Sequence, residues 1–426
     1  MKLDYKKTFL IGLAFFSICA FWQMYNNLIP LILRDTFKIG DTVAGVIMAG
    51  DNIIGLFLLP VFGAFSDKTN TPIGRRMPYI VGGTAVAAVL TVLLPVIADA
   101  YSAKPAVWLT VVFILLLGVL LITMGVYRSP AVALMSDVTP KPLRSSGNAV
   151  INVMGTVGAG LYLVLSAIML SGTKTSGAHV SYLAIFIAIA AVMVSSVAAL
   201  FFTVNEPKLA AKVAEKDSVE AVSEQAQDDT SKKMPKDVRK SVIFMLLTVA
   251  FWYMGYNALE TAFTKYATLQ WNMSVGYANI CLLVVLVIAT IAFVPMGNLA
   301  QRIGRRRSVL YGTAIQAAGF AVMSVYSFFF NFFSPVLFIL FAIVGVAYAA
   351  TVVNTLPMVV EMCDGSEVGK FTGYYYTFSM LAQIATPILS GALLEHVGYV
   401  SLFPYSAVFI ALAFVMMFFV KHGDSK

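Results

Sequence analysis

The sequence predicts an all-α membrane protein in which twelve transmembrane helices form two pseudo-symmetric six-helix bundles. Two compositional observations indicate the membrane: 59% of the 426 residues are hydrophobic and only 12% are charged, whereas a soluble domain has about 25% charged residues. A third observation, an echo of short motifs between the two halves, indicates the pseudo-symmetry. In such a chain each polar residue inside an apolar stretch needs its own explanation.

The apolar runs give the individual helices. A helix crosses the hydrocarbon core of a bilayer with roughly 20 apolar residues. Twelve runs of that order are present, at residues 9–33, 42–65, 78–98, 107–130, 145–170, 180–203, 241–263, 276–296, 308–330, 335–358, 372–394 and 399–420. Residues 205–240 interrupt the series with a polar, highly charged stretch, which predicts a cytoplasmic linker. The predicted domains are therefore residues 1–204 and 241–426.

The net charge of +8 is explained by membrane topology. With the N-terminus inside, most of the 29 Lys and Arg residues fall on the cytoplasmic side. The segments predicted outside hold only a small set of cations, namely Arg34, Lys38, Lys104, Lys174 and Lys265. This distribution follows the positive-inside rule and places both termini in the cytoplasm. It needs no nucleic-acid partner, and short loops favour a bacterial inner membrane.

The sequence offers little for catalysis or metal binding. Its three cysteines, Cys19, Cys281 and Cys363, lack the spacing of metal ligands. It contains no phosphate-binding loop of the Walker type, so no ATP machinery is expected. We predict neither an enzyme nor a bound cofactor or metal.

Short motifs of the first half recur in the second. "FWQMYNN" (21–27) is echoed by "FWYMGYN" (251–257), "GAFSDKTNTPIGRR" (63–76) by "GNLAQRIGRRR" (297–307), and "MSD" (135–137) by "MCD" (362–364). The echoes occur in the same order and at nearly the same spacing, which indicates a duplicated six-helix unit. Transporters are commonly built in this way, with substrate bound near the midplane between the halves.

The first echo predicts a substrate site. Positions i, i+3, i+4 and i+7 share one face of a helix, which gives Gln23, Asn26, Asn27 and Pro30 in the first span. The same positions in the seventh span are Tyr253, Tyr256, Asn257 and Glu260. Amides and hydroxyls hydrogen-bond to sugars, and the rings of Trp22 and Trp252 provide flat apolar surfaces. The alternative is that the amides hydrogen-bond to neighbouring helices.

Two stretches carry a family resemblance. The loop "GAFSDKTNTPIGRRMPY" (63–79) resembles the signature loop of the major facilitator superfamily, and its spacing is similar to that of the sucrose/proton symporters and the glycoside–pentoside–hexuronide cation symporters. "YRSPAVALMSDVTPKPLRSSGNA" (127–149) resembles the same branch. The resemblance links Arg128 to transport, and we expect Asn148 and Asn152, at positions i and i+4 of the fifth span, to join it in the site. The alternative is that Arg128 lies shallow and extends to the cytoplasm.

In that superfamily the loop latches the cytoplasmic gate. The resemblance implies that Asp67 contacts the second half and that Arg75 or Arg76 pairs with Asp137, while Arg144 belongs to the same motif region. In the second-half loop Gln301 replaces the acid, so the two latches differ. Glu361 and Asp364 are the expected partners of the arginines at 302 and 305–307.

Proton coupling needs an acid within a span. Asp51 in the second span and Glu260 in the seventh are the candidates, because a desolvated carboxylate is more easily protonated. The alternatives are an Asp51–Arg128 ion pair and a Glu260 exposed at the outer mouth. The sodium site of the melibiose-type relatives is not expected, since Leu59 and Met124 stand where acids would be needed.

The sequence therefore predicts a transporter that imports a neutral sugar, such as a disaccharide α-glucoside, by proton symport. Its expected partners are the sugar, protons and the lipid bilayer, and it is expected to act as a monomer. Export of amphipathic drugs or lipids is the alternative on the same fold, because Met (20 residues) and Phe (31 residues) are plentiful. A non-transporting nutrient sensor is a third hypothesis, which the short polar linker disfavours.

Overall fold

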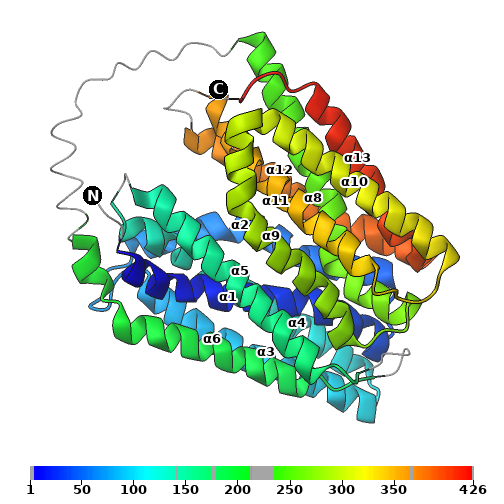
Figure 1. Ribbon diagram of the computed structural model, residues 1–426. Coiled ribbons are helices and arrows are strands. Elements are labelled where there is room, and N and C mark those ends of the chain that lie inside the picture. Colours follow the sequence, from blue (N-terminus) through cyan, green and yellow to red (C-terminus); the bar gives the residue numbers. More distant parts are fainter. Residues whose placement is uncertain are drawn as a thin grey trace. The chain divides into compact units, whose positions relative to one another are not determined.

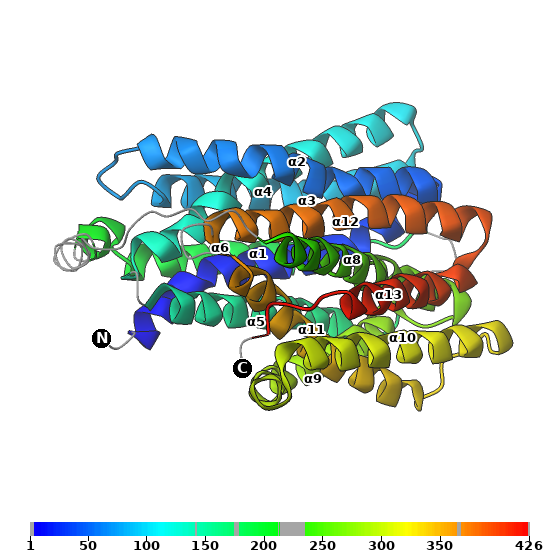
Figure 2. The same cartoon turned by 90° about the horizontal axis from the view of Figure 1, so that it is seen from above.

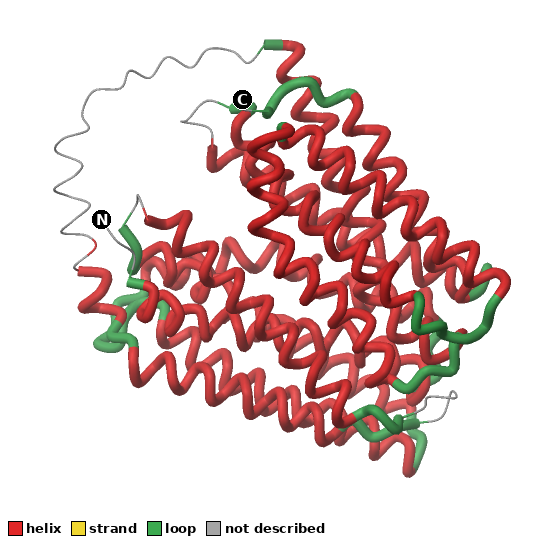
Figure 3. Tube along the Cα trace, in the orientation of Figure 1, coloured by secondary structure: helices red, strands yellow, loops and turns green. Residues whose placement is uncertain are grey.

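The computed structural model describes residues 4–140, 143–173, 179–211, 213, 235–363 and 368–424. Helices account for most of these residues, and short loops join them (Figure 3). Twelve of the described helical segments are long and apolar enough to cross a membrane. They correspond in order to the twelve predicted spans.

The helices of the first half are separated by short turns. A five-residue π-helical segment, η1, continues α1 directly before α2 begins. The elements are α1 (Tyr5–Leu31), η1 (Ile32–Thr36), α2 (Asp41–Lys68), α3 (Met77–Ala103), α4 (Val107–Asp137), α5 (Arg144–Met169) and α6 (Leu183–Thr203).

The second half repeats this pattern. Its first helix, α8, is the longest, with 35 residues. The elements are α8 (Lys236–Gln270), α9 (Val275–Ile303), α10 (Arg305–Phe329), α11 (Leu337–Glu361), α12 (Val368–His396), η4 (Tyr399–Ser401) and α13 (Leu402–Phe418). Helix α8 therefore extends beyond the apolar run 241–263 at both ends, which matters for the site below.

Contacts between residues divide the chain into two compact units. The first unit contains residues 1–25, 53–165 and 179–229. Within it α3 packs against α4 and α6, as Figures 1 and 2 both show. Close packing of α3 on α4 requires Gly83, because a Cβ atom there would lie 2.6 Å from the Cβ of Tyr127.

The second unit contains residues 26–52, 166–178 and 230–426. Within it α11 packs against α9 and α10, and α8 packs against α12 and α13 (Figure 2). One apolar cluster includes Met245, Met358 and Phe371, all buried. This unit also includes the C-terminal part of α1, η1 and the N-terminal part of α2, which bring polar residues against α8 and α12.

Glu206 forms an unexpected cap in the first unit. The sequence places it in the polar linker, yet only 1% of its surface is exposed. Its carboxylate accepts hydrogen bonds from the backbone N–H groups of Arg75 (2.8 Å), Arg76 (2.9 Å) and Met77 (2.9 Å). These groups form the N-terminus of α3, where unpaired N–H groups and the helix dipole favour an anion. Gly74, with φ +116°, makes the turn that leads into this site.

We expect Glu206→Ala to destabilise the first unit. Hydrogen bonds to a charged group contribute about 1.5–3 kcal/mol each, so the thermal unfolding midpoint of the purified protein should fall clearly. The midpoint of Glu206→Gln should fall less, because the amide oxygen still accepts one or two of the hydrogen bonds. Lys208→Ala, at an exposed position in the same segment, is the matched control. An unchanged midpoint in Glu206→Ala would contradict the capping role.

Candidate functional site

The predicted stripe on α1 is divided between the two units. In the first unit Gln23 is 8% exposed, and the guanidinium carbon of Arg128 lies 5.8 Å from the centre of the Trp22 ring. Such cation–π contacts stabilise an arginine inside an apolar environment. Trp22 and Arg128 therefore contact one another.

The predicted stripe on α8 forms an aromatic cluster in the second unit. The rings of Trp252 and Tyr256 stack with their centroids 5.8 Å apart, and Tyr348 of α11 lies 4.4 Å from Tyr256. Trp252 is buried and donates a hydrogen bond from Nε1 to Gln316 Oε1 at 2.8 Å. The Trp252 ring, which this hydrogen bond holds in place, thus packs against Tyr256 and Tyr348 and orients them. The neighbouring candidates Tyr253 and Asn257 are half-buried and buried, respectively.

Asn27 takes part in a chain of hydrogen bonds within the second unit. Thr264 Oγ1 of α8 lies 2.8 Å from Asn27 Oδ1 and 2.9 Å from Asn279 Oδ1 of α9. Asn279 Nδ2 in turn donates to Ser166 Oγ of α5 at 2.6 Å. The side chain of Asn27 is therefore hydrogen-bonded to a neighbouring helix, which is the alternative to a role in substrate binding. Asn26, one residue before it, is half-buried.

A buried ion pair lies next to this chain. Lys265 Nζ donates to Asp41 Oδ1 at 2.8 Å, and the two side chains are only 5% and 6% exposed. Tyr399 of η4 donates its hydroxyl hydrogen to the other oxygen of Asp41. Arg34 of η1 lies over the ring of Tyr399, with its guanidinium carbon 5.2 Å from the centroid. The carboxylate is therefore satisfied by a cation and a hydroxyl, as burial of a charge requires.

We call Asp41, Lys265, Tyr399, Asn27, Thr264, Asn279 and Ser166 the clasp. It lies at the end of α1 and α8 remote from Tyr5 and Lys236, which we call the far end. The clasp joins α1, α2 and α5 of the predicted first half to α8, α9 and η4 of the second. Its polar groups are matched with one another, so hydrogen bonds and an ion pair hold these helices of the second unit together at the far end.

Small residues let the helices of the clasp approach one another. A Cβ atom on Gly45 of α2 would lie 2.0 Å from the carbonyl oxygen of Pro387 in α12. A Cβ on Gly391 of α12 would lie 2.4 Å from the carbonyl oxygen of Asp41. Glu395 of α12 accepts a hydrogen bond from the Thr42 backbone N–H at 2.7 Å. The α2–α12 contact therefore depends on backbone proximity as well as on charge.

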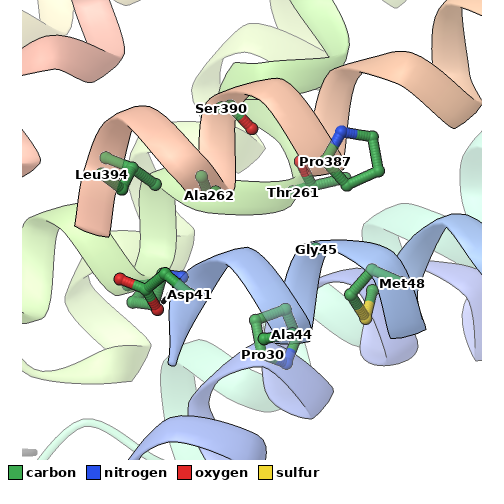
Figure 4. Close-up of a pocket in the computed structure, with 12 residues that line it drawn as sticks. Pro30, Asp41, Ala44, Gly45, Met48, Thr261, Ala262, Pro387, Ser390 and Leu394 are labelled. Atoms are coloured by element: carbon green, nitrogen blue, oxygen red, sulfur yellow. Dashed lines mark hydrogen bonds and ion pairs between the residues drawn. The ribbon is translucent and has the colours of Figure 1, made fainter. Parts of the chain in front are cut away.

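A small cavity adjoins the ion pair (Figure 4). Its volume is about 20 Å³, which is enough for one water molecule. Its polar lining comes from Asp41, Lys265, Thr261 and Ser390, and Pro30, Gly45 and Pro387 are among its other lining residues. Figure 4 shows Ser390 and Pro387 on α12 across from Gly45 on α2. The buried carboxylate thus borders a space that can hold solvent.

The two predicted coupling acids lie elsewhere. Asp51 of α2 accepts hydrogen bonds from the backbone and side-chain nitrogens of Asn52, at 2.6 and 2.8 Å. Glu260 of α8 is half-buried and lies one helical turn after Tyr256. Asn152, predicted as a substrate ligand, is exposed on α5. Glu260 therefore belongs to the aromatic cluster, and neither acid is among the residues of the clasp.

The loop between α2 and α3 forms a network around Arg76. Arg76 is only 4% exposed, and its Nε donates to Asp137 Oδ2 of α4 at 2.8 Å. It also donates to Asp67 and Ser66 of α2. Burial opposes the charged form of Arg76, but these hydrogen bonds raise the pKa of its guanidinium above the usual value, so it stays cationic. Arg75 makes a longer and more exposed contact with Asp137, at 3.4 Å.

The second-half loop has a different set of partners. Arg305 at the start of α10 pairs with Glu361 at the end of α11. The backbone N–H of Arg305 donates to Asp424 near the C-terminus at 2.6 Å, and Arg306 donates to the carbonyl oxygens of Phe418 and Val420. The predicted gate residues Asp364 and the Arg144 side chain lie outside the described part of the chain.

Two matches to one family model decide the family. The model of the Major Facilitator Superfamily matches residues 11–292 and 245–426. The chain belongs to the major facilitator superfamily. The predicted all-α fold of twelve transmembrane helices is thereby confirmed, and the chain is a multi-pass integral membrane protein of a transporter family. The sucrose-symporter branch named from the loop motifs stays a prediction.

Solved structures of transporters share the fold. A bacterial homologue of the iron transporter ferroportin, in an inward-facing state, superimposes with a TM-score of 0.72 at 13% identity and covers 98% of this chain and 99% of its own. A mutant of the nucleoside transporter NupG superimposes with a TM-score of 0.68 at 14% identity, and the match covers 97% of this chain and 100% of that one. The POT family transporter PepTSo gives a TM-score of 0.69 at 10% identity, and the match covers 98% of each chain. At such identities the likeness concerns the fold alone.

A curated relative is "Uncharacterized protein YqgE" from Bacillus subtilis (strain 168). It is 24% identical over 196 residues, which is 45% of this chain. The match spans less than half of that protein's length, 44%. It adds no information on cargo.

The clasp is the part of the site that the sequence analysis missed. The apolar run ends at residue 263, which places Lys265 among the outside charges, whereas α8 continues through Gln270. Asp41 lies one residue before the predicted second span, outside every motif. The sequence does hold one signal: Lys265 follows "TAFT" without any turn residue between them, which is typical of a helix that continues.

Proposed function

We propose that the chain is a secondary active transporter that imports a neutral sugar by proton symport through alternating access. In this proposal both termini lie in the cytoplasm, the membrane is a bacterial inner membrane, and the protein acts as a monomer. The observation that carries alternating access is the clasp. It joins helices of the two predicted halves by polar contacts, and polar contacts exchange with water at lower cost than a packed apolar core.

The sugar is supported by the residue types of the two stripes. Gln23, Asn26, Tyr253, Tyr256 and Asn257 offer donors and acceptors for hydroxyl groups. Trp22 and Tyr256 offer aromatic surfaces, and Tyr348 extends that surface. The iron, nucleoside and peptide transporters that share the fold differ from one another in cargo, so the fold alone does not select a substrate. The proposal therefore depends on these side chains and on the loop resemblance.

Uptake into proteoliposomes tests the proposal. Labelled sugars should accumulate under an inward proton gradient, and a protonophore should abolish the accumulation. Asn257→Ala should weaken apparent sugar affinity about tenfold, the effect of losing roughly one hydrogen bond. Gln301→Ala, an exposed amide at the end of α9, is the matched control. Accumulation that follows sodium and ignores the protonophore would contradict proton coupling, and unchanged affinity in Asn257→Ala would contradict the stripe.

The aromatic cluster favours one second candidate, the export of amphipathic compounds. Tyr256 and Tyr348, packed on the buried ring of Trp252, form an apolar surface, and the acid Glu260 lies one helical turn after Tyr256. Binding of detergent-like compounds to the purified protein, with no binding of sugars, would favour export over sugar uptake.

A further inference from the structure

The strongest unassigned feature of the chain is the buried pair of Asp41 and Lys265. Asp51 and Glu260 are the acids that the sequence predicts to carry a proton, but neither lies among the residues of the clasp. Asp41 is the acid of the clasp, it is 6% exposed, and it adjoins a cavity large enough for one water. The carboxylate of Asp41 therefore carries a charge, takes part in the contacts of the clasp and borders a space that can hold water.

We propose that Asp41 is the proton-coupling residue and that Lys265 is its counter-ion in the closed far end. This inference rests on the proposed proton symport. A proton from the far-side solution binds a carboxylate oxygen of Asp41, and the Lys265 Nζ–Asp41 hydrogen bond is lost. Lys265 is then a buried cation without its anion, which is costly, so the far end opens. When the far end closes again, the ammonium of Lys265 displaces the proton from Asp41 to the water of the cavity, and the proton then leaves toward the cytoplasmic side, as symport requires.

The groups around Asp41 fit a switch controlled by one proton. Tyr399 donates to Asp41, and Arg34 lies over the Tyr399 ring. Glu395 is held by the Thr42 backbone N–H, and Asp35 pairs with Arg34. The titratable and charged groups near Asp41, taken from every element packed against it, are Lys265, Tyr399, Arg34, Asp35, Lys38, Glu395 and His396. Lys265 is the cation in direct contact with the carboxylate.

The clasp also explains how one proton would affect several helices. Asp41 begins α2, and its carbonyl oxygen lies against Gly391 of α12. Lys265 follows Thr264, whose hydroxyl lies within hydrogen-bond distance of the side-chain oxygens of Asn27 of α1 and Asn279 of α9. Movement of Lys265 away from Asp41 therefore disturbs the contacts of α8 with α1 and α9 as well as with α2.

Thiol labelling of the full-length protein tests the inference without any sugar. The background is a variant with Cys19, Cys281 and Cys363 replaced by serine, and the probe site is S390C, which lines the cavity and is 3% exposed in the closed far end. A membrane-impermeant maleimide is added from the far side at a series of pH values. F332C, at an exposed loop position, corrects for the pH dependence of the thiol itself.

We expect the corrected labelling rate of S390C to rise as the pH falls. In Asp41→Asn, which imitates the protonated acid, labelling should be fast and should not change with pH. Asp41→Glu keeps a carboxylate and should restore a pH-dependent rate, which shows that the asparagine variant is not simply misfolded. Gel filtration of each variant checks that it remains a single species.

The same variants distinguish the inference from the proposed function. If wild-type protein accumulates sugar under a proton gradient and Asp41→Asn does not, both stand. If wild-type protein transports no sugar but labelling is pH-dependent only with Asp41 present, the cargo is wrong and the proton site stands. If the pH dependence of S390C labelling persists in Asp41→Asn, Asp41 is not the proton site.

Discussion

Lys265→Met will strongly destabilise the protein. It leaves the Asp41 carboxylate buried with only the Tyr399 hydroxyl as a described side-chain partner. Breaking a buried ion pair by removing one partner costs about 3–5 kcal/mol, because the remaining charge is uncompensated. The measurement is the thermal unfolding midpoint of the purified protein in detergent, compared with wild type.

The double variant Asp41→Asn with Lys265→Met provides the control. Replacing both charges removes the uncompensated ion, and such replacements are often neutral, so most of the lost stability should return. Lys38→Met, at an exposed cation near the same end, should have little effect. Equal midpoints for Lys265→Met and wild type would mean that the pair contributes nothing to the closed far end.

Arg76→Ala will have the second large effect, on the first unit. The side chain is buried and bridges Asp137, Asp67 and Ser66. Among the described residues, its removal leaves Asp137, which is 17% exposed, with the longer contact to Arg75. We expect a loss of about 1.5–3 kcal/mol, the contribution of a hydrogen bond to a charged group, and a matching loss of transport.

Arg75→Ala is the matched control for that substitution. The two arginines are neighbours and contact the same acid, but Arg75 is 44% exposed and its contact is 3.4 Å long. Exposed ion pairs contribute about 0–1 kcal/mol. Thermal midpoints and initial uptake rates of both variants are the readouts. If Arg75→Ala proves as damaging as Arg76→Ala, the network is not centred on Arg76.

The membrane fold was predictable because it follows from hydropathy along the chain. Each apolar run long enough to cross a bilayer became a helix, since backbone groups in lipid must be satisfied within the segment. The edges were less accurate. Lys265 and Thr268 extend α8 by polar residues that are buried against other helices, and hydropathy does not register such burial.

The contacts between distant positions were predictable only where a motif pointed to them. The pairing of Arg76 with Asp137 follows from the loop resemblance. The pairing of Asp41 with Lys265 has no local signal, because it depends on how α2 and α8 pack. The burial of Glu206 was not predictable for a similar reason. Its partners are backbone N–H groups, which are present at the start of every helix and leave no signature in the sequence.

Thr264 and Lys265 are consecutive residues, and this adjacency has a consequence for cooperativity. Successive side chains on an α-helix point about 100° apart. Thr264 therefore contacts the amides of α1 and α9, while Lys265, the next residue, forms the ion pair with Asp41 of α2. A rotation of α8 that breaks one link strains the other. The far end should therefore open and close as one two-state unit, with partly open states rarely populated. A change at Thr264 or at the Lys265–Asp41 pair should then alter the opening of the whole far end.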